Sequence, residues 1–114
     1  MAVARPPPTE LLQSAWLPVI VAYVRRLIPA LSRDLSLTSW YRDPIHNHSV
    51  GGDPHSQHLV ALATDWAGPP DALDQLVELA RLQGLHPVAR RGYVHVQAFP
   101  AGALGRIGVE FPTV

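Results

Sequence analysis

The 114-residue chain contains no cysteine. This absence excludes disulfide bonds, zinc fingers, iron–sulfur clusters and thiol nucleophiles, so any metal must bind through histidine or carboxylate side chains. The chain also has no net charge, because nine basic residues balance nine acidic ones. A nucleic-acid-binding surface usually carries an excess of positive charge, and we therefore expect no nucleic-acid partner.

No apolar run is long enough to cross a membrane. The most apolar stretch, residues 11–31, is interrupted by Pro18 and Pro29 and contains Arg25 and Arg26, whereas a spanning helix needs about 20 largely apolar residues. The first eight residues also lack the pattern of a signal peptide, since a single arginine is followed by three prolines. We expect neither a membrane span nor an export signal in this sequence.

The composition does provide enough apolar material for one core. Hydrophobic residues make up 47% of the chain and charged residues 16%, against a usual charged share of about 25%, which excludes disorder of the whole chain. The length fits one domain. We expect an extended N-terminal lead-in over residues 1–8 and a single domain over residues 9–114.

The spacing of apolar residues predicts two helices. Within residues 10–31, apolar side chains recur every three or four positions, which indicates a core helix with a kink at Pro18. A second helix is predicted over residues 71–83, because acidic Asp71 lies in its first turn and Gly84 follows its end.

The remaining segments predict a small sheet. Strands are expected over residues 35–40, 59–66, 85–88 and 92–98, the last two joined as a hairpin through residues 89–91. The polar residues 43–57 should form a long loop, and no element is predicted after Pro100. This order indicates an α+β domain, with two helices on one face of a small, mainly antiparallel sheet.

Three residues have the chemistry of a metal site. His58, Asp65 and His95 offer two imidazoles and one carboxylate, the ligand set of a catalytic Zn²⁺ with an open fourth position. Tyr93, His95 and Gln97 share one face of their predicted strand. In a regular strand His58 and Asp65 face opposite ways, so His58 must still lie in the loop or the strand must bend. Spacing alone favours a plainer interpretation, in which the three residues are a strand cap, a hydrogen-bonded or salt-bridged carboxylate and a core histidine.

Several short motifs follow one another in a recognisable order. They are Ser39-Trp40-Tyr41-Arg42-Asp43-Pro44, Asn47, Val50-Gly51-Gly52, Ser56-Gln57-His58, Ala61, Ala63, Asp65 and Gly92-Tyr93-Val94-His95-Val96. The series resembles the zinc D-Ala-D-Ala carboxypeptidase family of peptidoglycan metallopeptidases. In that family an S-x-Y-R strand end precedes S-x-H-x-x-G-x-A-x-D, and an H-x-D or H-x-Q strand comes last.

The resemblance implies a fold like that of D,D-peptidases and hedgehog domains, with a zinc site at the sheet edge. It implies that His58, Asp65 and His95 bind Zn²⁺ and that Ser56 lines the substrate site. It also implies that Arg42 contacts the substrate or the oxyanion that develops on the attacked carbonyl, a role suited to a fixed guanidinium group.

Arg42 has a plainer alternative role, a surface salt bridge with Asp43 or Asp53. Asn47 and Gly52 are expected to shape the loop rather than to take part in the chemistry. The other histidines of this loop match no metal ligand of the family and are expected to be solvated.

Two positions depart from the family pattern. Many members carry an acidic general base three residues before the last ligand, where this chain has Gly92, although other branches also carry glycine there. His86 could supply the base if the fold brings it close enough. Ala61 replaces the usual glycine, which should add one methyl group to the local packing.

We therefore expect a zinc-dependent peptidase that cleaves stem or cross-link peptides of bacterial peptidoglycan, as a D-Ala-D-Ala carboxypeptidase or an endopeptidase. Without an export signal, we expect an endolysin-like protein that acts on the cell wall. It would be phage-encoded or cytoplasmic until a lysis partner releases it, or it would be carried in a virion. The alternative is an inactive relative that binds the cell wall or a phage structural partner, and Gly92 favours it. The sequence indicates no oligomeric state.

Overall fold

Four short strands form one antiparallel sheet in the order β1-β2-β4-β3. The computed structural model describes residues 4–32 and 34–114, and it places the strands at β1 (Ser36–Ser39), β2 (Ala63–Ala67), β3 (His86–Arg90) and β4 (Tyr93–Gln97). The two central strands, β2 and β4, carry Asp65 and His95. The α+β class and the antiparallel sheet predicted from the sequence are confirmed.

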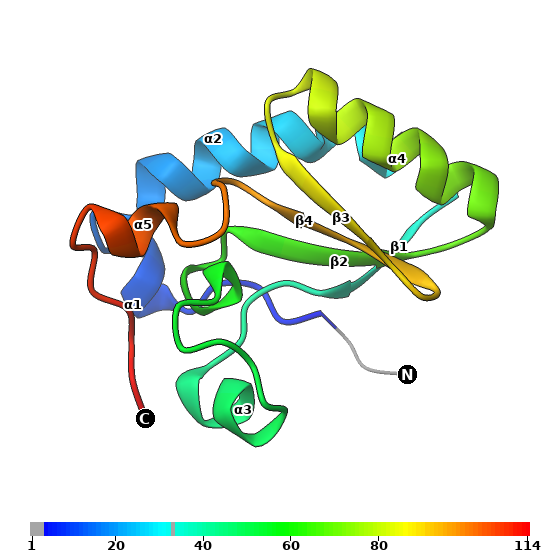
Figure 1. Cartoon of the computed structure of the whole chain (residues 1–114). Helices are drawn as coiled ribbons and strands as arrows, with labels where there is room; N and C mark the ends of the chain where they lie inside the picture. The colour runs from blue at the N-terminus through cyan, green and yellow to red at the C-terminus, as the bar shows by residue number, and fades with distance from the viewer. Residues whose placement is uncertain (1–3, 33) are drawn as a thin grey trace.

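Two helices, α2 (Leu17–Leu27) and α4 (Pro70–Leu82), cover one face of this sheet (Figure 1). Their apolar faces meet the inward side chains of β4 in a single core, which includes Ile20, Tyr23, Leu27, Leu76, Ala80, Val94 and Val96. The second helix lies within one residue of its predicted position. In the part of the chain that the structure describes, none of the helices has the length and hydropathy that a bilayer span requires.

The first helix differs from the prediction. Instead of one kinked helix over residues 10–31, the chain forms a single turn, α1 (Thr9–Leu12), then α2, then the 3-10 segment η1 (Ile28–Ser32). Pro18 lies in the first turn of α2, where its missing N–H costs no helical hydrogen bond. The proline therefore marks the start of a helix rather than a kink within one.

The strand predicted over residues 59–66 begins later than expected. Residues 57–60 form the 3-10 segment η2 (Gln57–Val60), and β2 starts only at Ala63. Every residue from 57 to 64 is buried, so this apolar run has no period that could distinguish a 3-10 turn from a strand. His58 thus precedes the strand, which is one of the two arrangements that let it face Asp65.

The segment predicted as a long loop contains the short helix α3 (Pro44–Ser49). The Asp43 carboxylate caps it by accepting a hydrogen bond from the backbone N–H of His46 at 2.7 Å, and Pro44 occupies its first position. The helix is polar and only six residues long, so it has no apolar face for sequence analysis to detect.

The predicted hairpin of β3 and β4 is present, but its turn lies further along the chain. Arg90 pairs with Tyr93, so the turn consists of Arg91 and Gly92, and the glycine has φ +85°. Beyond the last strand, the single turn α5 (Ala103–Arg106) buries Leu104 in the core, where no element was predicted.

Tyr23 joins the helical layer to both central strands. Its buried hydroxyl donates to the carbonyl oxygen of Val96 at 2.6 Å. Because that bond uses its only hydrogen, the hydroxyl accepts from Thr64 Oγ1, which lies 2.8 Å away. Burial raises the pKa of Tyr23, so the hydroxyl stays neutral. Thr64 and Val96 adjoin Asp65 and His95, so Tyr23 holds the Thr64 side chain and the Val96 backbone beside these two residues.

We expect Tyr23→Phe to lower the free energy of unfolding by about 1–3 kcal/mol, because it leaves the buried Val96 carbonyl and Thr64 hydroxyl without this partner. Urea denaturation followed by circular dichroism measures the change. Tyr93→Phe, at an exposed strand position, is the matched control and should change stability by less than about 0.5 kcal/mol. An equal effect of the two substitutions would show that the Tyr23 hydroxyl contributes nothing specific.

Candidate metal centre

His58, Asp65 and His95 converge although they come from three separate elements. Asp65 in β2 is the direct cross-strand partner of His95 in β4, so both side chains lie on the same face of the sheet. His58 reaches them from η2. One ligand atom from each of the three residues can be chosen such that all lie within 4.8 Å of one another.

The distances between these atoms suit one bound cation. Asp65 Oδ1 lies 2.8 Å from His95 Nδ1, and Asp65 Oδ2 lies 3.3 Å from His58 Nε2. Donors bound to a tetrahedral Zn²⁺ at about 2.0–2.2 Å are separated by roughly 3.3 Å. Two imidazole nitrogens and a carboxylate oxygen also match the donor preference of zinc. The residues present therefore fit this ion.

The ring of His58 is fixed by its surroundings. Its Nδ1 lies 2.6 Å from the carbonyl oxygen of Trp40. A carbonyl oxygen can only accept, so Nδ1 donates its hydrogen to Trp40, and Nε2, which faces Asp65, is the nitrogen left to bind a metal ion. The hydroxyl of Ser56 caps η2 by accepting a hydrogen bond from the backbone N–H of His58 at 3.2 Å.

Asp65 is ionised at this site. Burial favours the neutral carboxyl, but hydrogen bonds and positive charge from His58 and His95 outweigh that effect and hold the pKa of Asp65 well below its usual range. The carboxylate therefore remains negative throughout the neutral range, as a metal ligand must.

A cavity of about 380 Å³ opens over the three donors. Predicted residues Arg42 and Ser56 line it together with His58, Asp65 and His95, so the structure brings all five predicted site residues to one place. Other residues of the wall include Asp53, His55, Gln57, Arg90, Tyr93 and Gln97.

Residues 5–97 match the family model for Peptidase M15. The chain belongs to the peptidase M15 family. This membership agrees with the resemblance to the zinc D-Ala-D-Ala carboxypeptidases that the motif series indicated, and M15 peptidases are metallopeptidases. Neither the comparison with curated proteins nor that with solved structures gave a match.

Arg42 of this M15 peptidase is held by an amide rather than by a carboxylate. Its Nη1 donates to Asn47 Oδ1 at 3.1 Å, and Asn47 Nδ2 donates in turn to the Asp53 carbonyl at 3.0 Å. Within residues 4–32 and 34–114, Arg42 forms no ion pair with Asp43 or Asp53; Asp43 contacts Arg5 instead, at 3.4 Å. The guanidinium is thus oriented by a neutral amide.

Asn47 and Gly52 form the support of Arg42, which the sequence reading missed. Both residues were expected only to shape a loop, but Asn47 is buried and orients the guanidinium. A Cβ atom at Gly52 would clash with the Asn47 side chain and lie 3.1 Å from Arg42 Nη1. A buried asparagine in an otherwise polar, exposed segment has no sequence signal of its own, because its burial depends on the fold.

Ala61 was expected only to add a methyl group to the local packing, but it also adopts an unfavourable backbone conformation. It ends η2 in the left-handed conformation, with φ +59°, and is fully buried. A residue with a Cβ costs about 1–2 kcal/mol in that conformation, which accounts for glycine as the usual family residue. This M15 peptidase therefore carries backbone strain between His58 and Asp65.

Gly92 and His86, the two positions discussed for a general base, are both absent from the lining of the cavity. Gly92 is in the hairpin turn, and a Cβ built there would meet nothing within 4 Å. His86 is the cross-strand partner of Gln97 but is not among the residues that line the cavity. Asp53, His55 and Tyr93 are the titratable wall residues besides the three donors and the arginines.

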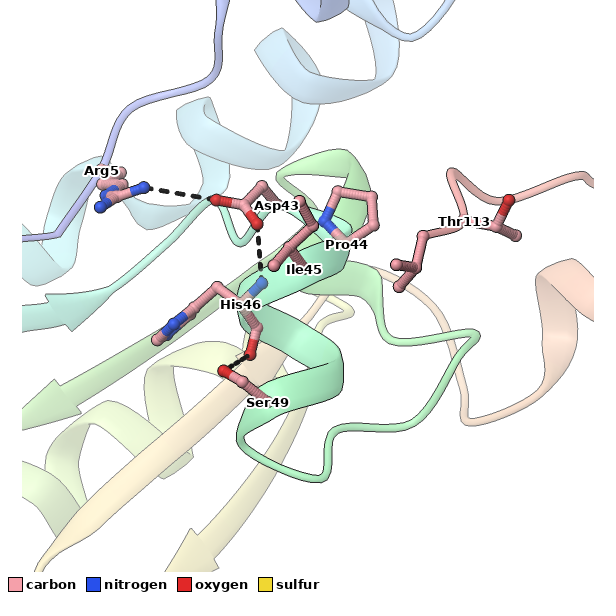
Figure 2. A pocket seen from close by; sticks show the side chains of 8 residues that line it. Arg5, Asp43, Pro44, Ile45, His46, Ser49 and Thr113 are labelled. Carbon is pink, nitrogen blue, oxygen red and sulfur yellow. Dashed lines mark hydrogen bonds and ion pairs between the residues drawn. The ribbon is translucent and has the colours of Figure 1, made fainter.

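A second hollow, of about 540 Å³, lies beside α3 (Figure 2). Its wall includes the exposed Arg5–Asp43 contact and the Asp43 cap of α3. Among the described residues, the three donors form the only group of metal-binding side chains close enough to share an ion, and none of them lines this hollow. The metal chemistry therefore belongs to the smaller cavity.

We expect Gly52→Ala to displace Asn47, release Arg42 and lower the free energy of unfolding by about 1–3 kcal/mol, because the new methyl group overlaps a buried side chain. Chemical denaturation measures the stability. Gly105→Ala is the matched control, since a Cβ there meets nothing within 4 Å and alanine suits its helical position. Equal stability of wild type and Gly52→Ala would contradict the described packing of Asn47.

Proposed function

We propose that this M15 peptidase hydrolyses stem or cross-link peptides of bacterial peptidoglycan, as a D-Ala-D-Ala carboxypeptidase or an endopeptidase, with Zn²⁺ as its cofactor. The observation that carries the proposal is the convergence of His58, Asp65 and His95 on the floor of an open cavity. The family resemblance supplies the substrate class. We further propose an endolysin-like role, with the cell wall as the place of action.

The three donors leave room for a further ligand in a four-coordinate site. A Zn²⁺ ion bound there would lower the pKa of a coordinated water and polarise a substrate carbonyl. The ionised Asp65 would offset part of the charge of the ion. The hydrogen bond from His58 Nδ1 to the Trp40 carbonyl leaves Nε2 as the nitrogen that binds the metal.

Arg42 is suited to bind the negative charge of the substrate. Asn47 fixes the guanidinium on the cavity wall, and no carboxylate among the described residues forms an ion pair with it. A fixed guanidinium can bind a peptide carboxylate or stabilise the charge that develops on the attacked carbonyl oxygen. In this role Arg42 contacts the substrate directly.

A second candidate function is cell-wall binding without hydrolysis. The observation that favours it is Gly92, a turn residue at the position where many relatives carry the acidic base. Under the peptidase proposal, one of the titratable wall residues, Asp53, His55 or Tyr93, moves the proton instead.

Purified wild-type protein with added zinc is expected to release new amino or carboxyl groups from peptidoglycan, and a chelator should stop the release. His58→Ala should reduce the rate at least about 100-fold, because it removes one metal-binding nitrogen and the hydrogen bond to Trp40 that fixes its tautomer. His48→Ala, at an exposed position of α3 outside this cavity, is the control and should retain the wild-type rate. Quantifying the released groups over time gives all the rates.

The outcomes separate the two candidates. Equal rates for wild type and His58→Ala would end the metallopeptidase proposal. If the wild type binds zinc and sediments with peptidoglycan but releases no groups at any pH, the binding function is supported instead.

A further inference from the structure

Gln97 contacts the ring nitrogen of His95 that faces away from Asp65. His95 Nδ1 lies 2.8 Å from Asp65 Oδ1, and His95 Nε2 lies 2.8 Å from Gln97 Oε1. Gln97 follows His95 by two strand positions, which places both side chains on one face of β4. Both nitrogens of this ring are thus engaged within the cavity.

The orientation of the Gln97 amide is fixed by the backbone carbonyl of Phe99. Gln97 Nε2 donates to this carbonyl oxygen at 2.9 Å. Reversing the amide would place two oxygens against each other, so Oε1 must face His95. The amide therefore presents an acceptor, not a donor, to the ring.

A second glutamine holds Phe99 in place. Buried Gln57 donates from Nε2 to the Phe99 carbonyl at 2.7 Å and accepts from the Phe99 N–H at 3.0 Å with Oε1. Because Gln57 immediately precedes His58, these two bonds also connect the segment that carries one histidine to the end of the strand that carries the other. The acceptor facing His95 is therefore held by hydrogen bonds to Phe99, which the buried Gln57 holds in turn.

We infer that Gln97 is a positioning residue for His95: it holds the ring hydrogen on Nε2 and so leaves Nδ1 free to bind a metal ion. Without a metal ion, the Asp65 carboxylate accepts a hydrogen from Nδ1, and a bound ion would take the place of that hydrogen. A hydrogen on Nδ1 alone would leave Nε2 and Gln97 Oε1 facing each other as two acceptors at 2.8 Å. Gln97 thus favours the form of His95 whose Nδ1 can bind the ion.

This inference rests on the proposed metal site, and zinc affinity tests it without an activity assay. Competition with a chromophoric chelator should show about 10–100-fold weaker zinc binding by Gln97→Leu, the usual effect of losing such a partner of a metal ligand. Gln97→Glu keeps an acceptor for Nε2 and should bind zinc at least as tightly as the wild type. Gln75→Leu, on the exposed side of α4, is the control and should bind as the wild type does.

A purely structural role of Gln97 would give a different pattern. A glutamate cannot donate to the Phe99 carbonyl, so Gln97→Glu would then be damaged as much as Gln97→Leu. Nitrogen-15 NMR of zinc-loaded wild type provides a readout that does not depend on any variant folding. We expect the His95 hydrogen on Nε2, in slow exchange with water, and faster exchange in Gln97→Leu.

Each possible result of these experiments either supports or overturns the role of Gln97. Wild-type zinc affinity in a folded Gln97→Leu, weak binding by Gln97→Glu, or a ring hydrogen found on Nδ1 would each overturn the inference while leaving the metal site intact. A wild type that binds no zinc would remove the proposed metal site and this inference with it.

Discussion

The ionised carboxylate of Asp65 lies between two imidazoles, and the surrounding fold is arranged around that contact. A charge removed from water needs partners for both its oxygens, and His95 and His58 provide them at 2.8 and 3.3 Å. The contact with His95 requires the exact cross-strand pairing of β2 with β4, since a slip of one residue would send one side chain to the opposite face. The contact with His58 requires the chain to leave the strand direction, and η2 with the left-handed Ala61 accomplishes this.

Hydrogen bonds from neighbouring groups hold the residues of the cavity in place. The Trp40 carbonyl and Gln97 each engage one histidine, and Asn47 engages Arg42. Among the described residues, no buried side-chain nitrogen or oxygen lacks a hydrogen-bond partner. Polar groups that are fully paired in this way are oriented before any ligand arrives, which reduces the reorganisation that binding and catalysis require. Tyr23 extends the same support to the core, through the strand positions beside Asp65 and His95.

Sequence analysis predicted the elements whose side chains follow a clear period. The helix over 70–82 has one buried and one exposed face, and the strand over 93–97 alternates between buried and less buried residues. It failed where burial is continuous, as in residues 57–64, and where a short polar helix is defined by a cap, as at Asp43. The five candidate site residues came from an ordered motif series, and the structure places all of them around one cavity. Gln57 and Asn47 were not, since their partners are distant in sequence; for Gln97, the two-residue spacing from His95 was the available signal.

The central claim is that His58, Asp65 and His95 bind one metal ion together. Metal analysis of the freshly purified protein, compared with Asp65→Asn and with Asp74→Asn on the exposed side of α4, tests it most directly. The account predicts close to one zinc per chain in the wild type and in Asp74→Asn, and almost none in Asp65→Asn. A wild type without bound metal even after incubation with zinc, or equal zinc content in all three proteins, would contradict it.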